Sequence, residues 1–551
     1  MFDAHKYRPI SVPRFFERTW PERTLTKPPT WCSVDLRDGN QALVEPMGQE
    51  RKLRLFEKLV EVGFKEIEVG FPAASQTDFD FVRLLIEQNR IPADVTIQVL
   101  TQAREGLIRR TMASLHGARR AIVHLYNSTN PAQRKIVFGM SQAQVRDLAV
   151  QGTRWVQSAA AEIPGTEIVL EYSPESFSAT ELDFAVSVVD AVVEAWNPNP
   201  GRKMIVNLPA TVESSTPNLY ADQIEWMGSH IQRRADVVLS VHAHNDRGCA
   251  VAATELAMLA GADRVEGTLF GNGERTGNAD VVTLALNLYT QGVPPGLDFS
   301  DLPSIVQTFE ECNQMPVPAR QPYAGELVFT AFSGSHQDAI AKGLAARSHD
   351  STATWEVPYL PVDPADVGRA YEPLIRINSQ SGKSGVSFVL GQSHGYHVPK
   401  GLAVELSRVV QEATDDSGKE LAPSAILGIF ERAYLANDGR RALLDYDVQH
   451  PSPDHCHLSA RMRDGGATVT VAGEGKGALE AFVSAVGKQI GLTLQVGDFS
   501  EHALGAGSDA EAVAYVKLQS VDGNQAWGAG RDRDIVTASL RAVVGAMNRL
   551  G

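Results

Sequence analysis

The sequence predicts an α/β protein that begins with a (β/α)8 barrel. Three observations support this fold class: short β-branched apolar runs alternate with helical stretches, eight such runs follow one another, and reactive side chains come after several of them. Eight alternations within about 250 residues have the length and rhythm of such a barrel. A doubly wound open sheet also alternates, but the number of runs favours the barrel.

The predicted strands are short apolar runs, each separated from the next by enough residues for a helical crossover. They are Trp31–Asp35, Glu66–Gly70, Thr96–Leu100, Ala121–Leu125, Glu167–Glu171, Met204–Leu208, Val237–His242 and Arg264–Leu269. Barrel enzymes build their sites from the loops at the carboxyl ends of the strands. The reactive residues at those ends are Arg37, Asp38, Glu171, Glu175, Thr211, His242, His244 and Asn278.

The remaining chain lacks this alternation. Segments rich in Pro, Gly and polar residues follow the barrel, at 314–325 and 355–368, and predict a linker with small helical subdomains. Near the end, two strands and a helix (455–463, 467–472, 476–490) recur as 512–519, 526–530 and 532–550. We therefore expect an arm at 1–30, a barrel at 31–312, a linker at 313–438 and a C-terminal α+β domain at 439–551, built from a duplicated strand–strand–helix unit.

Composition excludes several classes of protein. A net charge of −15 over 551 residues argues against an extended phosphate-binding face, so we expect no nucleic acid partner. The four cysteines are scattered along the chain and include no C-x-x-C pair. This pattern is typical of proteins in a reducing compartment. No signal peptide and no apolar run near 18 residues is present, so the sequence predicts a cytoplasmic protein without membrane contact.

His242 and His244 flank Ala243 at the end of a predicted strand. A period of two points both imidazoles to one face, here the barrel axis. Together with Asp38 they form a facial set that can hold Mg²⁺, Mn²⁺ or Zn²⁺. The alternative for the two histidines alone is a hydrogen-bonded loop without metal.

The same strand ends suit a 2-oxo acid, which chelates such a cation through its carboxylate and keto oxygens. Arg37 offers a charged donor to a developing alkoxide, or else forms a salt bridge. Thr211 can donate to the substrate carboxylate, although an isolated threonine is more often a helix cap.

Two further segments carry weaker signals. The glycine-dense loop from Gly271 to Asn278 either approaches a ligand with its backbone or only makes tight turns. The cluster Asp454-His-Cys-His457 places two histidines on one face of a strand. We interpret this cluster as a solvent-exposed strand start.

Four motifs occur in order: Val34-Asp-Leu-Arg-Asp-Gly-Asn-Gln41, Asn207-Leu-Pro-Ala-Thr-Val-Glu213, His242-Ala-His-Asn-Asp-Arg-Gly248 and Asn272-Gly-Glu-Arg-Thr-Gly-Asn278. With them, and with its long C-terminal part, the chain resembles the 2-isopropylmalate synthases of the longer, bacterial type. One departure is Ala243, where many relatives carry Pro.

The resemblance implies a Claisen-type condensation of acetyl-CoA, as co-substrate, with 2-oxoisovalerate, the first committed step of leucine synthesis. It implies Asp38, His242 and His244 as ligands of a divalent cation, with Asn278 close by. Arg37, Glu175 and Thr211 would hold or polarise the oxo acid.

The resemblance also implies a homodimer, because His336 and Tyr371 of the linker would complete the site of the partner chain. The base that removes the methyl proton of acetyl-CoA is then His336 or Glu175, and we favour His336. Leucine is expected to inhibit by binding the C-terminal domain at Ala506, Gly507, Asp509 and Tyr515.

Three alternatives stay open at this point. The barrel motifs also fit homocitrate or citramalate synthases, since pocket size decides between oxo acids. They fit a metal-dependent acyl-CoA lyase or aldolase as well, although the long C-terminal part favours a regulated biosynthetic enzyme. An amino-acid sensor with a vestigial barrel is disfavoured by the retained Arg37, Asp38 and histidines.

Overall fold

The computed structural model describes residues 17–331, 333–349, 354–371, 383–417, 423–436, 439–452, 454–505 and 510–550. Two compact units make up the chain: Met1–Phe329 with Val362–Ala370, and Thr330–Pro361 with Tyr371–Gly551. Each unit is considered by itself below. No helix among these described residues is long and apolar enough to cross a membrane.

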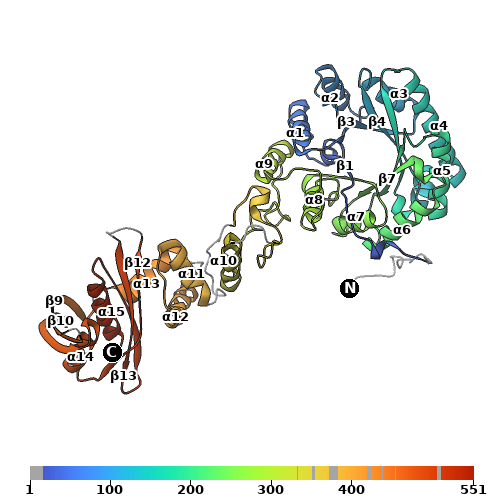
Figure 1. Ribbon diagram of the computed structural model, residues 1–551. Helices are drawn as coiled ribbons and strands as arrows, with labels where there is room; N and C mark the ends of the chain where they lie inside the picture. Colours follow the sequence, from blue (N-terminus) through green and yellow to red (C-terminus); the bar gives the residue numbers. More distant parts are fainter. Residues whose placement is uncertain are drawn as a thin grey trace. The chain divides into compact units, whose positions relative to one another are not determined.

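The first unit contains the predicted barrel. Its eight strands are parallel, pair in chain order and close between β1 and β8 (Figure 1). They are β1 (Thr30–Ser33), β2 (Glu66–Gly70), β3 (Thr96–Gln102), β4 (Arg120–Ser128), β5 (Glu167–Glu175), β6 (Met204–Ala210), β7 (Val237–Ala243) and β8 (Arg264–Gly267). The fold class and all eight strands are confirmed.

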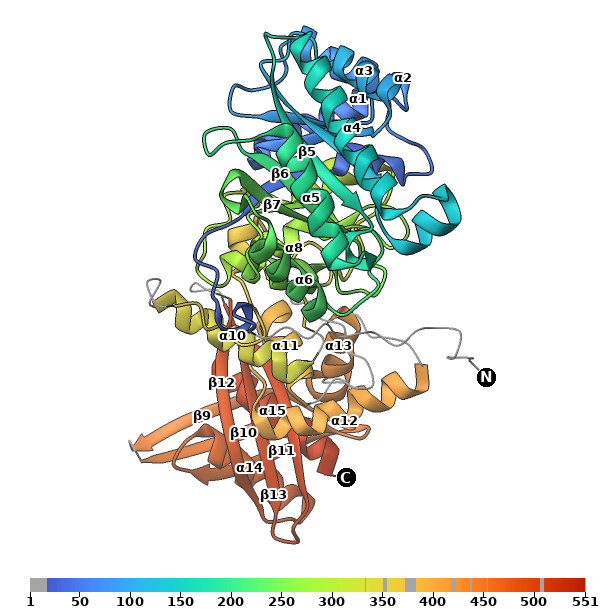
Figure 2. The same ribbon diagram turned by 90° about the vertical axis from the view of Figure 1, so that its right-hand side faces the viewer.

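Helices between the strands form the outer ring of the barrel (Figures 1 and 2). They are α1 (Gln49–Val62), α2 (Gln76–Glu87), α3 (Glu105–Ser114), α4 (Gln142–Ala161), α5 (Leu182–Trp196), α6 (Pro217–His230), α7 (Ala250–Leu259) and α8 (Val281–Tyr289). Their apolar faces are buried, as in α5, where Phe184, Val188 and Val192 lie toward the strands. After α8, α9 (Leu302–Asn313) packs on α1.

Two strands end earlier than the sequence predicts. β1 stops at Ser33 because the next residues, Asp35–Gly39, wind into a π-helical turn. β8 stops at Gly267 because the Leu269 N–H is bonded to the Asp35 carboxylate (3.0 Å) rather than to a strand. This one contact ties the loops after the first and last strands together, at the point where the barrel closes.

The side chains inside the barrel change from apolar to polar along the barrel axis. At the amino ends of the strands, Ile122, Val169 and Ile205 form an apolar cluster. The next positions along the strands are polar and buried, and Arg264 lies among them with bonds to Ser240 (2.8 Å) and Gln98 (2.7 Å). A buried charge layer therefore lies directly below the carboxyl ends of the strands.

The second unit begins with helices, as the linker prediction requires. They are α10 (Gly334–His349), α11 (Lys383–His394), α12 (Lys400–Ser417) and α13 (Pro423–Phe430). Helices α11, α12 and α13 share a core that includes Leu390, Leu406 and Phe430.

The C-terminal domain consists of two three-stranded antiparallel sheets, each with one helix. Sheet order is β11-β10-β9 and β12-β13-β14. The elements are β9 (Arg441–Ser452), β10 (His455–Asp464), β11 (Ala467–Gly475), α14 (Ala478–Ile490), β12 (Leu494–Leu504), β13 (Glu511–Ser520), β14 (Gln525–Asp532) and α15 (Ile535–Leu550). The predicted duplication is confirmed, and each repeat has one more strand than predicted.

Candidate functional site

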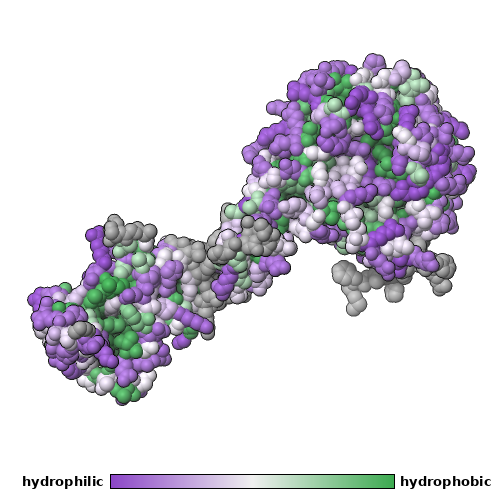
Figure 3. Space-filling model, in the orientation of Figure 1, coloured by the Kyte–Doolittle hydropathy of each residue, from purple (hydrophilic) through white to green (hydrophobic). Residues whose placement is uncertain are grey.

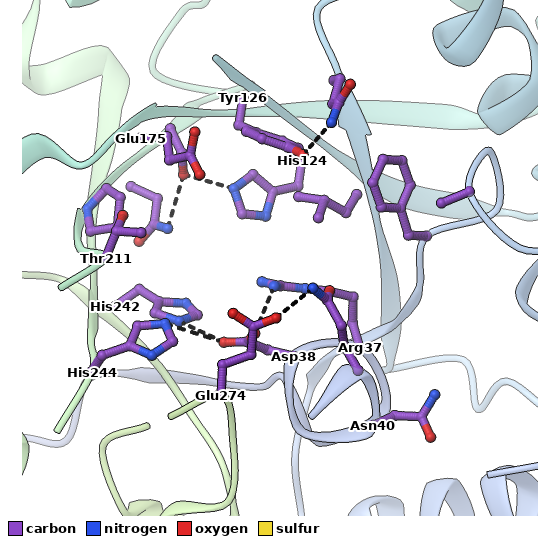
Figure 4. A pocket seen from close by; sticks show the side chains of 18 of the residues that line it. Arg37, Asp38, Asn40, His124, Tyr126, Glu175, Thr211, His242, His244 and Glu274 are labelled. Carbon is purple, nitrogen blue, oxygen red and sulfur yellow. Dashed lines mark hydrogen bonds and ion pairs between the residues drawn. The ribbon is translucent and has the colours of Figure 1, made fainter. Parts of the chain in front are cut away.

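The carboxyl ends of the barrel strands surround a pocket of about 580 Å³. Figure 4 shows its polar side chains facing inward from different strands. Among the lining residues are Arg37, Asp38, Phe71, Leu100, His124, Tyr126, Ser173, Glu175, Pro209, Thr211, His242 and His244. Six of the reactive residues predicted at strand ends therefore meet in one cavity.

Asp38, His242 and His244 form a buried cluster on one side of this pocket. Asp38 comes from the π-helical turn after β1, and the two histidines come from the end of β7. Nε2 of His242 lies 3.2 Å and Nε2 of His244 lies 3.4 Å from the same oxygen, Oδ2 of Asp38 (Figure 4). One carboxylate and two imidazoles at this spacing are a donor set that fits a divalent cation.

The charges in this cluster are set by burial and by close partners. Burial alone would raise the pKa of Asp38, but Arg37 and His242 outweigh it and hold that pKa well below its usual range. Burial would lower the pKa of His242, yet its bonds to Asp38 and Glu266 raise it to about 9. Burial and the neighbouring His242 lower the pKa of His244 to about 4. At neutral pH, Asp38 is ionised and His244 is neutral, so both can bind a cation directly, whereas His242 is protonated and has to release a proton to bind one.

Each histidine has a second ring nitrogen that faces away from Asp38. For His242, this Nδ1 contacts the buried carboxylate of Glu266 at 2.8 Å. For His244, Nδ1 is buried and has no hydrogen-bond partner among the described residues. His244 and Glu213, whose Oε1 is likewise buried without a partner, line a cavity of about 10 Å³, enough for about one water molecule.

Arg37 lies beside the cluster, between two acidic groups. Its Nη1 is 3.2 Å from Oδ1 of Asp38, and its Nε donates to the buried Glu68. Burial would lower the pKa of Arg37, but Glu68 and Asp38 raise it. The guanidinium is therefore charged and held in one orientation, with part of its edge toward the pocket.

Glu175 and Thr211 lie across the pocket from Arg37, on the same side as His242 and His244 (Figure 4). Glu175 is the last residue of β5 and accepts a bond from the hydroxyl of Ser128. Thr211 Oγ1 accepts from the backbone N–H of Ser176 (2.9 Å), which leaves its own proton available for a ligand.

Asn278 lies next to His244 in a backbone bridge but is not among the pocket-lining residues. Its amide donates to the Asn272 carbonyl (3.0 Å), and its Oδ1 is buried without a partner among the described residues. The glycines of this loop mainly allow its tight backbone turns. Gly277 has φ of +96°, and a Cβ there would lie 1.9 Å from the Gly271 oxygen.

His124, Tyr126 and Ser173 also line the pocket and were not predicted from the sequence. His124 bridges Glu68 (2.9 Å) and the hydroxyl of Ser173 (2.7 Å). Alternation along β4 would have found His124 and Tyr126, because Ile122 faces the barrel interior and residues two and four positions on share its face. The same alternation along β5, starting from the interior residue Val169, reaches Ser173.

Known proteins resemble this chain over nearly its whole length. The HMGL-like family matches residues 28–309, an alpha-isopropylmalate synthase post-catalytic domain-like family matches 326–391, and the LeuA allosteric (dimerisation) domain matches 420–551. A 2-isopropylmalate synthase of Cupriavidus taiwanensis is 57% identical, with 99% of this chain and 95% of the relative covered. The chain belongs to the 2-isopropylmalate synthase family.

Other members of the 2-isopropylmalate synthase family are similarly close. The relative from Parafrankia sp. is 55% identical, with 99% of this chain and 97% of the relative covered. The relative from Rhodospirillum rubrum is 54% identical, with 99% of both chains covered.

The remaining residues that the family resemblance singled out lie in the second unit. His336 is exposed on α10, where its ring stacks on Tyr359 at 4.0 Å. Tyr371 is partly buried, and burial raises its pKa. Ala506, Gly507 and Asp509 lie outside the described residues.

Tyr515 lies on β13 and is fully buried. Its ring packs in the core that also contains Phe430 and Trp527, and its hydroxyl has no partner among the described residues. The phenol therefore lies inside the domain rather than on its surface.

Proposed function

We propose that the chain condenses acetyl-CoA with 2-oxoisovalerate and water to give 2-isopropylmalate and CoA. The observation that carries this proposal is the buried cluster of Asp38, His242 and His244 in a barrel-mouth pocket. The 2-isopropylmalate synthase of Cupriavidus taiwanensis, 57% identical over 546 residues, supports the assignment.

In the proposed reaction, the methyl carbon of acetyl-CoA loses a proton and forms a bond to the keto carbon of the oxo acid. Asp38, His242 and His244 would hold a divalent cation, which would supply Lewis-acid polarisation of the keto oxygen. Arg37, which stays charged between Glu68 and Asp38, donates to the oxygen on which negative charge develops. Water then cleaves the thioester, and CoA leaves as the thiol.

Other residues have positioning and proton-transfer roles in this proposal. Thr211 donates its hydroxyl proton to the substrate carboxylate, and Glu175 orients the oxo acid from the end of β5. His336 of the partner subunit removes the methyl proton, and Tyr371 of the partner subunit completes the site. Asn278 supports the cation site from beside His244.

The pocket lining supports a branched oxo acid. Phe71, Leu100, Tyr126 and Pro209 supply apolar surface near the charged groups. Such apolar surface accommodates an isopropyl group better than a charged second carboxylate. This chemistry favours 2-oxoisovalerate over 2-oxoglutarate.

Dimerisation and regulation belong to the C-terminal domain in this proposal. Residues 420–551 match the LeuA allosteric (dimerisation) domain. The edge strand β12 exposes Val496 and Phe499, and Figure 3 shows hydrophobic side chains gathered on one face of this domain. We infer a homodimer inhibited by leucine, with the effector loop at Ala506, Gly507 and Asp509 and with Tyr515 beside it.

In this proposal the chain comprises an arm at 1–30, a barrel at 31–312, a linker at 313–438 and a C-terminal domain at 439–551. The four cysteines are free, which agrees with the cytoplasmic location inferred from their spacing.

The test is to measure thiol release from acetyl-CoA with a panel of 2-oxo acids, with and without a chelator. We expect the highest kcat/KM with 2-oxoisovalerate, and activity that is lost with chelator and restored by added cation. Preference for pyruvate or 2-oxoglutarate would contradict the substrate. No turnover with any oxo acid, after cation is restored, would contradict the reaction class.

The variant His242→Ala tests the cation site directly. It should lose cation-dependent turnover while its circular dichroism spectrum stays that of the parent chain. The matched control is His116→Ala, an exposed histidine of the same unit, which should keep full activity. Normal turnover in His242→Ala would refute the role of the cluster.

A further inference from the structure

The outer face of the β9–β11 sheet carries two histidines and a glutamate that converge. Along β10, Cys456 and Leu458 face the core, so that His455 and His457 project from the opposite face. The neighbouring strand β11 places Glu474 directly across from His457 in the antiparallel register. The sequence showed only the two histidines, and pairing of the strands adds the carboxylate.

The spacing of the three side chains fits a coordination site. His457 Nδ1 lies 3.3 Å from Glu474 Oε1, and His455 Nε2 lies 3.8 Å from Glu474 Oε2. Three donor atoms, one from each residue, all lie within 4.8 Å of one another. Ligands about 2.0–2.1 Å from a tetrahedral Zn²⁺ are about 3.4 Å apart, and the two histidine–glutamate separations, 3.3 and 3.8 Å, lie near that value.

The barrel cluster offers an internal comparison. Its donor atoms are separated by 3.2 and 3.4 Å, and it has the same composition of two imidazoles and one carboxylate. The two clusters differ in burial. The barrel cluster is buried, whereas the side chains of His455 and His457 are each 44% exposed.

We propose that His455, His457 and Glu474 form a second divalent cation site, on the surface of the C-terminal domain. Two imidazole nitrogens select borderline transition cations such as Zn²⁺, Ni²⁺ or Cu²⁺ over Mg²⁺ and Ca²⁺, which prefer oxygen. Water completes the coordination, because the side chains are open to solvent. The proposal does not rest on the reaction assigned to the barrel.

An ion pair between protonated histidines and Glu474 does not explain the arrangement equally well. Exposed ion pairs contribute little to stability, and the 3.8 Å separation at His455 exceeds a hydrogen bond. A bound cation would account for the arrangement, because the imidazoles of His455 and His457 and the carboxylate of Glu474 would all be its ligands.

Cation binding would join the start of β10 to the end of β11. Glu474 is followed by Gly475, Lys476 and Gly477, which lead directly into α14. A cation held here therefore stabilises the junction between this sheet and its helix, and binding should raise the thermal midpoint of the domain.

The experiment uses the full chain without a histidine tag, in the background His242→Ala/His244→Ala that removes the barrel ligands. Zn²⁺ binding is measured by equilibrium dialysis with elemental analysis. We expect one Zn²⁺ per chain, and its loss when His455→Ala/His457→Ala is added. Glu474→Gln should weaken binding by about tenfold or more.

The matched control is His450→Ala, an exposed histidine on β9 of the same sheet, which should keep the bound Zn²⁺. Circular dichroism checks that each variant is folded. If the background chain binds no Zn²⁺ at about 100 μM free cation, the dissociation constant is too weak for a specific site and the proposal is overturned. Undiminished binding after His455→Ala/His457→Ala would overturn it as well.

Discussion

Glu266 contacts Nδ1 of His242 at 2.8 Å, which leaves Nε2 of the same imidazole facing Asp38 at 3.2 Å. The carboxylate thus fixes both the tilt of the ring and the nitrogen that is offered to a cation. Glu266 is itself held by Arg264 (3.0 Å) and by the amide of Gln98 (2.8 Å). The cation site is therefore supported by the charge layer inside the barrel.

The first prediction concerns Glu266→Gln. The amide keeps the shape of the side chain but removes the charge that orients His242, so cation affinity should fall by about 10- to 100-fold. The measurement is the cation concentration that restores half of the activity to the stripped enzyme. Glu162→Gln, an exposed residue, serves as control. An unchanged cation requirement in folded Glu266→Gln would contradict this role.

The second prediction is that Arg37→Lys lowers kcat by about 100-fold, because a lysine cannot reach both Glu68 and Asp38 while donating to the substrate. Turnover is measured at saturating substrates and cation, so that binding losses do not enter. The exposed Arg109→Lys should behave as wild type. A kcat within twofold of wild type would show that charge alone suffices.

The third prediction is a pH dependence of stability that originates at Asp35. Burial raises the pKa of this carboxyl to about 7, against 3.8 in the unfolded chain. A raised folded-state pKa contributes stability that is complete below the unfolded pKa and is lost as pH rises through the folded one. Asp35 therefore favours folding at pH 4 and loses this contribution by about pH 7 to 8.

Asp35→Asn isolates this effect. The amide oxygen can still accept from the Leu269 N–H, and the amide nitrogen stands in place of the oxygen that accepts from the Ser33 hydroxyl, so that this bond can form with its direction reversed. Thermal midpoints of both chains are compared at pH 5 and pH 8. The variant should gain stability relative to wild type at the higher pH, whereas the exposed Asp147→Asn should show no such gain. If the thermal midpoints of Asp35→Asn and wild type differ by the same amount at pH 5 and at pH 8, the pH dependence does not originate at Asp35.

The sequence was sufficient for the barrel because its strands are buried and rich in apolar residues. It was insufficient for β9 and β12, which are edge strands of their sheets. In β12 only Leu494 is fully buried, and in β9 only Arg441 and Ala442 are. The buried residues of both strands lie only at one end, so these strands carry too little alternation of apolar and polar residues to be recognised.

The candidate site likewise contains some residues that the sequence predicts and others that it does not. Asp38, His242 and His244 stand out because they are polar residues at the ends of apolar runs. Glu266 and His124 lie inside runs that read as strand, so their roles depend on which strands become neighbours after closure. The contact between Glu266 and His242 joins β8 to β7, and sequence spacing alone does not supply that geometry.

The last prediction concerns leucine. Saturating leucine should lower the initial rate of the wild-type chain, and His242→Ala should still bind leucine with wild-type affinity. The physical reason is that the C-terminal domain has a core of its own, built from residues such as Leu458, Phe482 and Val543. Loss of the barrel cluster leaves that core intact. Isothermal titration calorimetry measures both affinities. Loss of leucine binding in His242→Ala would place the effector at the barrel, and an unchanged wild-type rate would remove leucine as an inhibitor.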